Sequence, residues 1–506
     1  MAIFLFCVAA LIMGYFVYGF VVEKVFGLKP YRTTPAYEQA DGVDYVPMSK
    51  TKVWLIQLLN IAGTGPIFGP IMGALYGPVA MIWIVIGCIF AGAVHDYFCG
   101  MISIRNGGAS IPNMAGRYLA APVKHFINII ALILLVLVGV VFVVSPAGLL
   151  TNLTEQALGR SGDLVAQGNP VHDSLVMIWV GIIFFYYIIA TLLPIDKIIG
   201  RIYPFFGALL MFMTGGMLVG LLCEGIPLFQ TIGLENGVAV QDFFSNFHPQ
   251  AANTPIWPLI FITITCGSIS GFHATQTPMM ARCIKNEREG RFVFYGAMIT
   301  EGIIALIWCM VGLSFYDDTQ TLIETIKVGT PSKVVFDAAM SMLGHFGGFL
   351  AVLGVVVLPI TSGDTAFRAA RLQIAEFFKI DQTGVNKRLL ICIPLFAIGA
   401  VLTKLDFSIL WRYFGWANQT TGMIMLWTAA AYLYRHGKFH WVCTIPAIFM
   451  TVICATYLCY AKIGFGLAWS LSCVIGAGIA VICTGLFFAL IRPNIATIAA
   501  ARDSGD

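Results

Sequence analysis

Two short glycine-rich stretches hold residue types that could bind a solute inside a membrane. The first reads Asn-Ile-Ala-Gly-Thr-Gly-Pro-Ile-Phe-Gly-Pro over residues 60–70, within an apolar run from 53 to 80. The second, Cys266 to His273, interrupts the apolar run that begins at Ile256. Inside lipid such breaks occur only where protein or a water-filled cavity satisfies the backbone. Paired interruptions of this kind indicate the binding site of a secondary transporter.

The first interruption could offer hydrogen-bond donors to an anion. If a half-helix resumes near Gly65, its first N–H groups have no intrahelical partner and favour negative charge. We therefore expect Asn60, Gly63, Thr64 and Gly65 to bind substrate. The alternative is that the glycines only allow close helix packing, which leaves the two prolines of this stretch unexplained.

The second interruption is unusually polar for its depth in the membrane. Polar side chains there are expensive and often line a pathway, so we expect Ser268, Ser270, His273 and Gln276 to bind substrate as well. Histidine titrates near neutral pH, so His273 could carry a proton or hydrogen-bond the solute. It could equally pair two helices, with both ring nitrogens satisfied.

Three carboxylates inside the apolar runs could couple transport to a cation or proton. Asp96, Glu301 and Asp364 lie in separate runs, and intramembrane carboxylates often mark proton relays. Asp96 could instead pair with Arg105, and Asp364 with Arg368, in structural roles.

Hydroxyl side chains next to Asp364 could hold sodium. Thr361, Ser362 and Thr365 would place hydroxyls beside unwound carbonyls, which is how transporters with broken helices coordinate this ion. Hydrogen bonding of each hydroxyl to its own helix is the alternative.

No other chemistry is indicated. His95, Asp96 and His273 do not match the spacing of a metal signature, and the 13 cysteines contain no Cys-x-x-Cys pair, so we expect no metal and no cofactor beyond the coupling ion. The chain lacks a nucleotide-binding loop, which argues against energy from hydrolysis within it, and it lacks a nucleophile-base or metal signature, which argues against an enzyme.

Composition places these residues in a polytopic membrane protein. The 506 residues are 59% hydrophobic and 11% charged, with a mean hydropathy of +0.86, whereas soluble domains carry about 25% charged residues. The net charge of +4 is small. Basic residues fall between the apolar runs, so they report on topology and not on nucleic-acid binding.

We expect an all-α protein with about 13 transmembrane helices, because apolar runs of roughly 17 to 25 residues can span a bilayer. With the loop after the first helix placed inside, inner segments hold 23 Lys and Arg and outer segments hold 6. The positive-inside rule then places the N-terminus outside, as a retained helix, and the C-terminus inside. The predicted spans are 2–22, 53–77, 79–102, 125–148, 174–194, 202–222, 255–280, 292–316, 346–366, 389–403, 416–434, 441–461 and 465–491.

The spans predict a core of two five-helix repeats of opposite orientation. Five helices separate the starts of the two interrupted helices, so the second enters from the opposite side of the membrane, as an inverted repeat requires. The predicted divisions are an N-terminal helix and cytoplasmic loop (1–52), repeat one (53–222), an external loop (223–254), repeat two (255–434), and two C-terminal helices with a tail (435–506). Segment 331–345 could be an amphipathic surface helix or a gate.

Several motifs resemble the carbon starvation protein A family of bacterial inner-membrane transporters. They are Asn60 to Pro70, Ala91 to Ser110, Thr265 to Ile284, Thr361 to Ala375 and Trp411 to Gln419. The resemblance implies the amino acid, polyamine and organocation superfamily, with a five-plus-five inverted repeat and broken first and sixth core helices around the substrate. It also implies uptake of peptides, or in some members pyruvate, usually with protons.

The sequence therefore predicts a proton- or sodium-coupled symporter in the bacterial inner membrane that imports a small carboxylate-bearing nutrient during carbon starvation. A short peptide is the first expectation, and pyruvate is the alternative. A membrane nutrient sensor that binds ligand without net transport is an alternative of another class.

Overall fold

Helices, joined by loops, make up the structure apart from two short paired strands. The computed structural model describes residues 2–42, 44–159, 170–192, 195–224, 234–235, 238–239, 243–380 and 384–493. The strands, β1 (Leu234–Glu235) and β2 (Val238–Ala239), are antiparallel. Ten of the described helices are long and apolar enough to cross a membrane, and a bent helix pair makes an eleventh. The expected all-α membrane fold is confirmed.

The first half of the chain contains an N-terminal helix and the first interrupted helix. A pair of helices and a short helical turn come first: α1 (Ala2–Phe16), α2 (Tyr18–Phe26) and α3 (Pro35–Glu38). The elements that follow are α4 (Lys50–Ile61), α5 (Gly65–Gly73), η1 (Ala74–Tyr76), α6 (Val79–Gly87), η2 (Cys88–Gly92), α7 (Ala93–Arg105), α8 (Ile111–Tyr118), α9 (Ala121–Ala157), α10 (Pro170–Leu192) and α11 (Ile195–Glu224).

The second half repeats this order, beginning again with an interrupted helix. Its elements are α12 (Ile256–Thr263), α13 (Gly271–Ala281), η3 (Glu287–Glu289), η4 (Arg291–Tyr295), α14 (Gly296–Ser314), α15 (Thr319–Phe378), α16 (Val385–Leu402) and α17 (Phe407–Arg435), followed by α18 (Trp441–Tyr460) and α19 (Trp469–Leu490). In both halves the helix after the interrupted one carries a π-helical turn, η2 or η4.

The described residues of each of the thirteen predicted spans fall mainly on helix, but two spans are not among those long and apolar enough to cross a membrane. The span of α12 and α13 is divided by the gap at residues 264–270 into two short helices, and α17 is not apolar enough. Both carry buried polar residues, and Ser270 and Asn418 hydrogen-bond each other inside the protein. These two side chains thus find their partners within the bundle, as lipid requires.

Segment 331–345 forms a helical part of its own within α15. Non-helical backbone at Gly329, Thr330 and Gly344 bounds this part on both sides. It buries Val334 and contacts α9, where the Ser332 hydroxyl donates to the carbonyl of Ser145 at 3.2 Å.

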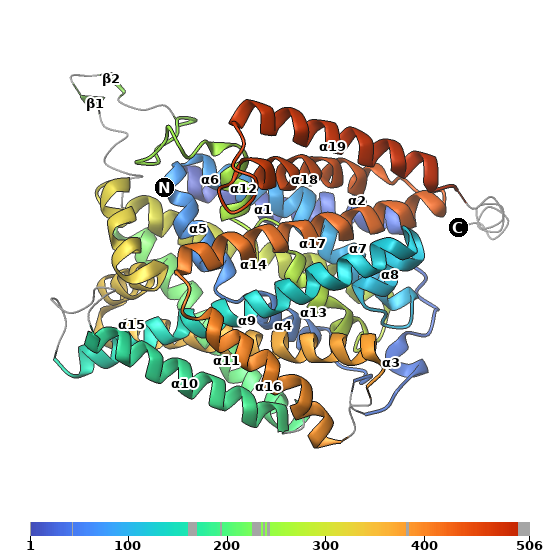
Figure 1. Ribbon diagram of the computed structural model, residues 1–506, viewed down its shortest axis with the longest axis horizontal. Coiled ribbons are helices and arrows are strands. Elements are labelled where there is room, and N and C mark those ends of the chain that lie inside the picture. Colours follow the sequence, from blue (N-terminus) through green and yellow to red (C-terminus); the bar gives the residue numbers. More distant parts are fainter. Residues whose placement is uncertain are drawn as a thin grey trace.

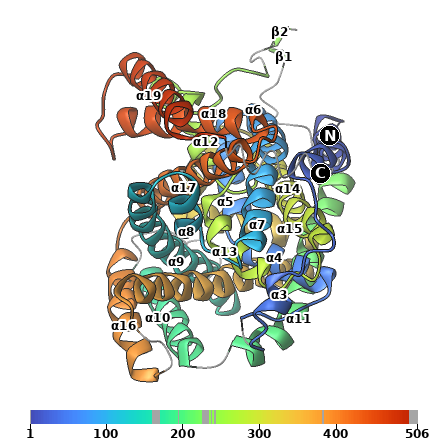
Figure 2. The same ribbon diagram turned by 90° about the vertical axis from the view of Figure 1, so that its right-hand side faces the viewer.

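The interrupted helices lie inside the bundle. Helices α9 and α15 pack along each other through the middle of the molecule, α18 and α19 lie on one side of it, and α10 and α16 lie on the opposite side (Figures 1 and 2). Helix α14 packs against α4 and α5 and is almost completely buried. This arrangement encloses both glycine-rich stretches in protein.

Candidate functional site

Both glycine-rich stretches break their helices where the sequence predicts. Helix α4 ends at Ile61 and α5 begins at Gly65, with a 49° bend between them. Helix α12 ends at Thr263 and α13 begins at Gly271. Within this second gap Gly267 has a φ of 86°, a backbone conformation that glycine adopts without strain.

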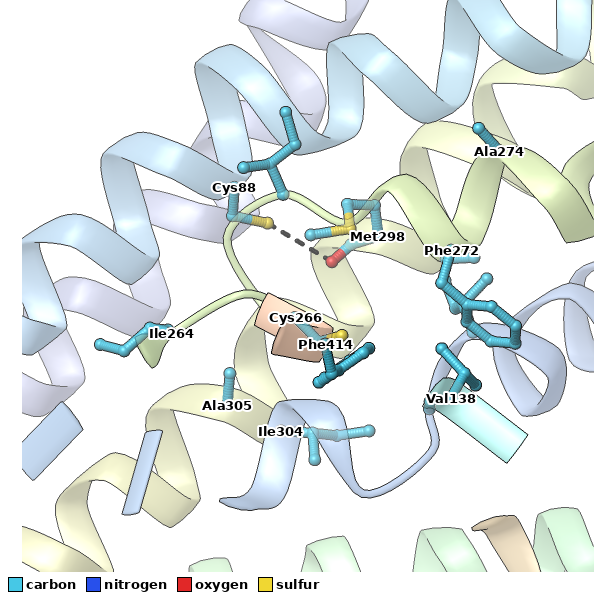
Figure 3. Close-up of a cluster of buried hydrophobic side chains, with 14 of the residues drawn as sticks. Cys88, Val138, Ile264, Cys266, Phe272, Ala274, Met298, Ile304, Ala305 and Phe414 are labelled. Atoms are coloured by element: carbon cyan, nitrogen blue, oxygen red, sulfur yellow. Dashed lines mark hydrogen bonds between the residues drawn. The ribbon is translucent and has the colours of Figure 1, made fainter. Parts of the chain in front are cut away.

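The two interruptions are in direct contact. A Cβ atom at Gly65 would overlap the Cys266 thiol, and one at Gly267 would overlap Ala305 of α14 and lie 3.9 Å from Pro66. Figure 3 shows the irregular chain between Ile264 and Phe272, with Cys266 facing α14. Segments far apart in the sequence thus meet at one place in the interior, which confirms the predicted pairing of the breaks.

Asn418 of α17 binds the N-terminus of α13, where the second interrupted helix resumes. Its Oδ1 accepts hydrogen bonds from the backbone N–H of Phe272 at 2.7 Å and from the Ser270 hydroxyl at 3.2 Å. The first N–H groups of a helix lack intrahelical partners, so Asn418 caps α13 from another helix. Asn418 lies within a family motif, but nothing in its spacing from Phe272 predicts this contact.

A fully buried charged cluster joins α7, α13 and α14. His273 Nδ1 lies 2.9 Å from Asp96 Oδ2, and His273 Nε2 lies 3.3 Å from Glu301 Oε2. The other oxygen of Asp96 is 2.7 Å from His95 Nδ1. All four side chains are 0% exposed. Asp96 therefore pairs with histidines and not with Arg105.

Arg105 has a different buried partner. Its guanidinium forms two hydrogen bonds with Glu287, at 3.0 and 3.1 Å, and a third with the Tyr432 hydroxyl at 3.0 Å. The backbone N–H of Lys29 also donates to Glu287, at 2.8 Å. This network joins α7, α17 and the segment after α2, so Arg105 has a structural role.

The hydroxyls of α15 are close to the first interruption, but two of them bond their own helix. Thr361 donates to the Leu358 carbonyl at 2.8 Å and Thr365 to the Ser362 carbonyl at 2.9 Å. Ser362 instead donates to the carbonyl of Leu59, in the last turn of α4, at 3.2 Å. Ser362 thus connects α15 to the first break.

Asp364 pairs with Arg368 one turn further along α15. The distance from Arg368 Nη2 to Asp364 Oδ2 is 3.2 Å, and the same nitrogen is 3.2 Å from the carbonyl of Ala190 in α10. Both side chains are largely buried. The pairing expected as the structural role of Asp364 is present.

The remaining predicted residues pack around the two breaks. A Cβ at Gly63 would overlap the ring of Phe142, so α9 approaches the first break closely. The Thr64 hydroxyl is buried and has no hydrogen-bond partner among the described residues. Ser268 donates to the Ile264 carbonyl at 2.7 Å, and Gln276 Nε2 donates to Thr275 at 3.0 Å.

A cavity of about 710 Å³ leads to the site. Asn60 lines it next to the first break, and Ala274 and Thr275, which follow His273, line it beside the second. Its other walls come from the beginnings of α4, α8 and α9 and the ends of α13 and α15. The cavity thus lies at the end of the bundle that the charge bias of the loops predicts to be cytoplasmic.

The cavity wall carries mostly positive charge. Among the described lining residues Asp44 is the only carboxylate. The Lys and Arg residues of the wall are Lys52, Lys124, Arg282, Arg368 and Lys379. A cleft lined by one sign of charge attracts ions of the opposite sign. In the sequence these cations lie at the ends of the spans, where they report on topology, so their convergence on one cavity could not be predicted.

Similar proteins include characterised transporters. An uncharacterized membrane protein of Haemophilus influenzae is 60% identical over 350 residues, which cover 64% of this chain and 94% of that protein. The peptide transporter CstA of Campylobacter jejuni is 27% identical, and the match covers 87% of this chain and 77% of that transporter. The pyruvate/proton symporter BtsT of Escherichia coli is 28% identical, and the match covers 57% of this chain and 45% of that symporter.

Solved structures of membrane transporters share the fold. MhsT in complex with L-phenylalanine aligns with a TM-score of 0.55 at 16% identity, covering 87% of this chain and 99% of MhsT. The Eremococcus coleocola manganese transporter aligns with a TM-score of 0.51 at 12% identity, covering 89% of this chain and 94% of its own. The family model of carbon starvation protein CstA matches residues 1–159 and 161–327. The chain therefore belongs to the carbon starvation protein CstA family.

Proposed function

We propose that the chain is a secondary active transporter that imports short peptides across the bacterial inner membrane by symport with a proton or sodium ion during carbon starvation. Its N-terminus would be periplasmic and its C-terminus cytoplasmic. The observation that carries the proposal is the positively lined cavity that reaches both helix interruptions. Relatives named as peptide and pyruvate transporters support the general activity.

The size of the cavity favours a peptide over pyruvate. Sites for drug-sized ligands occupy about 300–1,000 Å³, and the cavity has a volume of about 710 Å³. A dipeptide would fill much more of this space than a three-carbon acid, and its C-terminal carboxylate would meet the basic wall. Pyruvate, which the relative BtsT carries with protons, remains the second candidate because it offers the same carboxylate.

Arg368 is the cavity residue best placed to receive that carboxylate. It lines the cavity near the first break and is held by Asp364 at 3.2 Å. A planar guanidinium can bind a carboxylate through two parallel hydrogen bonds. A cation that neutralises Asp364 would release Arg368 for the substrate, so cation and substrate would bind together.

The second interruption would contribute mainly to the conformational change that carries the substrate across the membrane. Ser270 and the Phe272 N–H bond Asn418 within the bundle, and the cavity comes near this interruption only at Ala274 and Thr275 of α13. Because the breaks are packed against each other, they would move as one body relative to α9 and α15. That movement would close the inner cavity and open an outer one.

Uptake into proteoliposomes tests the proposal. Purified protein is reconstituted, and labelled dialanine or labelled pyruvate is supplied with a sodium gradient or a pH gradient imposed separately. The proposal expects gradient-driven accumulation of the dipeptide that excess unlabelled dipeptide abolishes. Accumulation of pyruvate alone would select the second candidate, and accumulation of neither solute under either gradient would contradict symport of these substrates.

A further inference from the structure

Three potential metal ligands converge at the second interruption. The ligand atoms of Cys266, His273 and Glu301 all lie within 4.8 Å of one another, and each side chain is buried. Cys266 lies in the gap between α12 and α13, His273 in the first turn of α13, and Glu301 in α14. They are far apart in sequence, which is why no metal signature is visible there.

The imidazole of His273 is oriented as a metal ligand. Its Nδ1 lies 2.9 Å from a carboxylate oxygen of Asp96, which can only accept a hydrogen bond when ionised. In the neutral imidazole Nδ1 therefore carries the proton, and Nε2 is left with a lone pair. A carboxylate that holds the far nitrogen of a histidine in this way is typical of metal sites.

Nε2 faces another acceptor with nothing between them. It lies 3.3 Å from Glu301 Oε2, in a geometry that falls short of a hydrogen bond between the two atoms. Two ligands that are each about 2.0 Å from a tetrahedral ion are separated by about 3.3 Å. The spacing therefore fits a bound ion between the two atoms.

The cluster also has too little positive charge. Asp96 and Glu301 are both 0% exposed, and among the described residues they form ion pairs with His95 and His273. Buried carboxylates are stable when they are paired or coordinate a metal. A divalent cation would supply the missing charge.

We propose that Cys266, His273 and Glu301 bind a resident divalent transition metal, with Zn²⁺ as the ion that suits this ligand set. Thiolate ligands favour Zn²⁺ over the hard cations, and imidazole and carboxylate complete a common zinc set. On binding, the Cys266 thiol loses its proton to water and a sulfur–metal bond forms, with no change in oxidation state. Asp96 is a positioning residue.

The position of the site indicates its role. The ion would tie the second interruption to α14, while Ala274 and Thr275, adjacent to His273, line the cavity through which an ion could enter. It would fix the irregular backbone around Gly267 without contacting the solute. The inference therefore does not depend on which solute is transported.

Metal analysis of the purified full chain tests the site. Protein from zinc-supplemented cells is expected to hold one zinc per chain by mass spectrometry of the metal. After removal of zinc, titration with Co²⁺ is expected to produce a thiolate-to-cobalt charge-transfer band. Cys266→Ser should lose this band. Cys309→Ser, which removes a buried cysteine of α14 that is not part of the site, should retain it.

Two variants that retain all cysteines distinguish the metal ligands from the positioning residue. Glu301→Gln should lose stoichiometric metal, and Asp96→Asn should keep the band but bind Co²⁺ about 10 to 100-fold more weakly. Wild-type protein that takes up neither zinc nor Co²⁺ would overturn the proposal, whether or not the variants fold. A band unchanged in Cys266→Ser would overturn it as well.

Discussion

Gly65 and Cys266, one from each interrupted helix, touch so closely that no side-chain atom fits at residue 65. Residue 65 is the first residue of α5, and Cys266 lies in the gap before α13. The contact joins the two halves of the fold at the point where the interrupted helix of each half is non-helical. The two breaks therefore form one structural unit.

Substitution of Gly65 by alanine should abolish transport and leave membrane insertion intact. The added methyl group overlaps Cys266, and overpacking of this kind costs about 1–3 kcal/mol, which would push the breaks apart. The measurement is dipeptide uptake, normalised to protein in the membrane. Gly181→Ala is the control, because a Cβ there meets nothing within 4 Å. Normal uptake by the Gly65→Ala protein would mean that the contact is not needed.

Replacing Arg368 by glutamine should weaken substrate binding. A hydrogen bond to a charged group contributes about 1.5–3 kcal/mol, so we expect KM for the dipeptide to rise roughly 10 to 100-fold. A dipeptide amide, which lacks the carboxylate, should be transported poorly by both proteins. Arg288→Gln provides the control, since Arg288 does not line the cavity. Equal KM values for Arg368→Gln and wild type would exclude Arg368 as the carboxylate ligand.

Asp364→Asn should separate exchange from accumulation. The amide keeps the shape of the side chain but cannot be neutralised by a cation, and it no longer holds Arg368 through an ion pair. Exchange of labelled for unlabelled dipeptide should persist, whereas accumulation driven by the coupling gradient should fall to the level without a gradient. Full gradient-driven accumulation would show that coupling lies elsewhere.

Acidic pH should destabilise the protein through His248, in the segment before α12. Burial, and then Lys327 and Arg412, lower the pKa of His248 from 6.5 to about 4. The unfolded chain therefore binds a proton that the folded chain does not, and the stabilisation present above pH 6.5 is lost as pH falls toward 4. The neighbouring Phe247 packs on Gly77, just after η1, so this segment covers the end of the first interrupted helix.

The measurement is the apparent Tm of detergent-solubilised protein between pH 4 and 7. His248→Gln, which cannot titrate, should show a smaller fall in Tm over this interval than wild type. Identical pH profiles would indicate that the fall comes from other groups.

The sequence predicts the breaks well, because glycine and proline act locally. Residues 62–64 and 264–270 are non-helical, as the clusters of these residues indicate, and the spans follow from the apolar runs. The length of α15 is harder to predict. Non-helical residues at 329, 330 and 344 divide it into three helical parts, and nothing in the sequence of residues 331–345 shows that this part packs on α9.

The chemistry of the site depends on contacts that sequence spacing does not encode. Asp96 and His273 are 177 residues apart, and Asn418 and Phe272 are 146 apart. Each of these polar residues has a structural explanation when taken alone. Cys266 in particular has the features of an ordinary packing cysteine until its neighbours are known.

Solute counterflow in proteoliposomes tests the central claim most directly. Vesicles are loaded with unlabelled dipeptide, diluted into a trace of labelled dipeptide, and followed without any ion gradient. If the two interrupted helices form an alternating-access site, label should accumulate transiently inside vesicles with wild-type protein and not inside vesicles with Gly65→Ala. Binding of the dipeptide without any exchange of label would contradict transport and would fit a sensor instead.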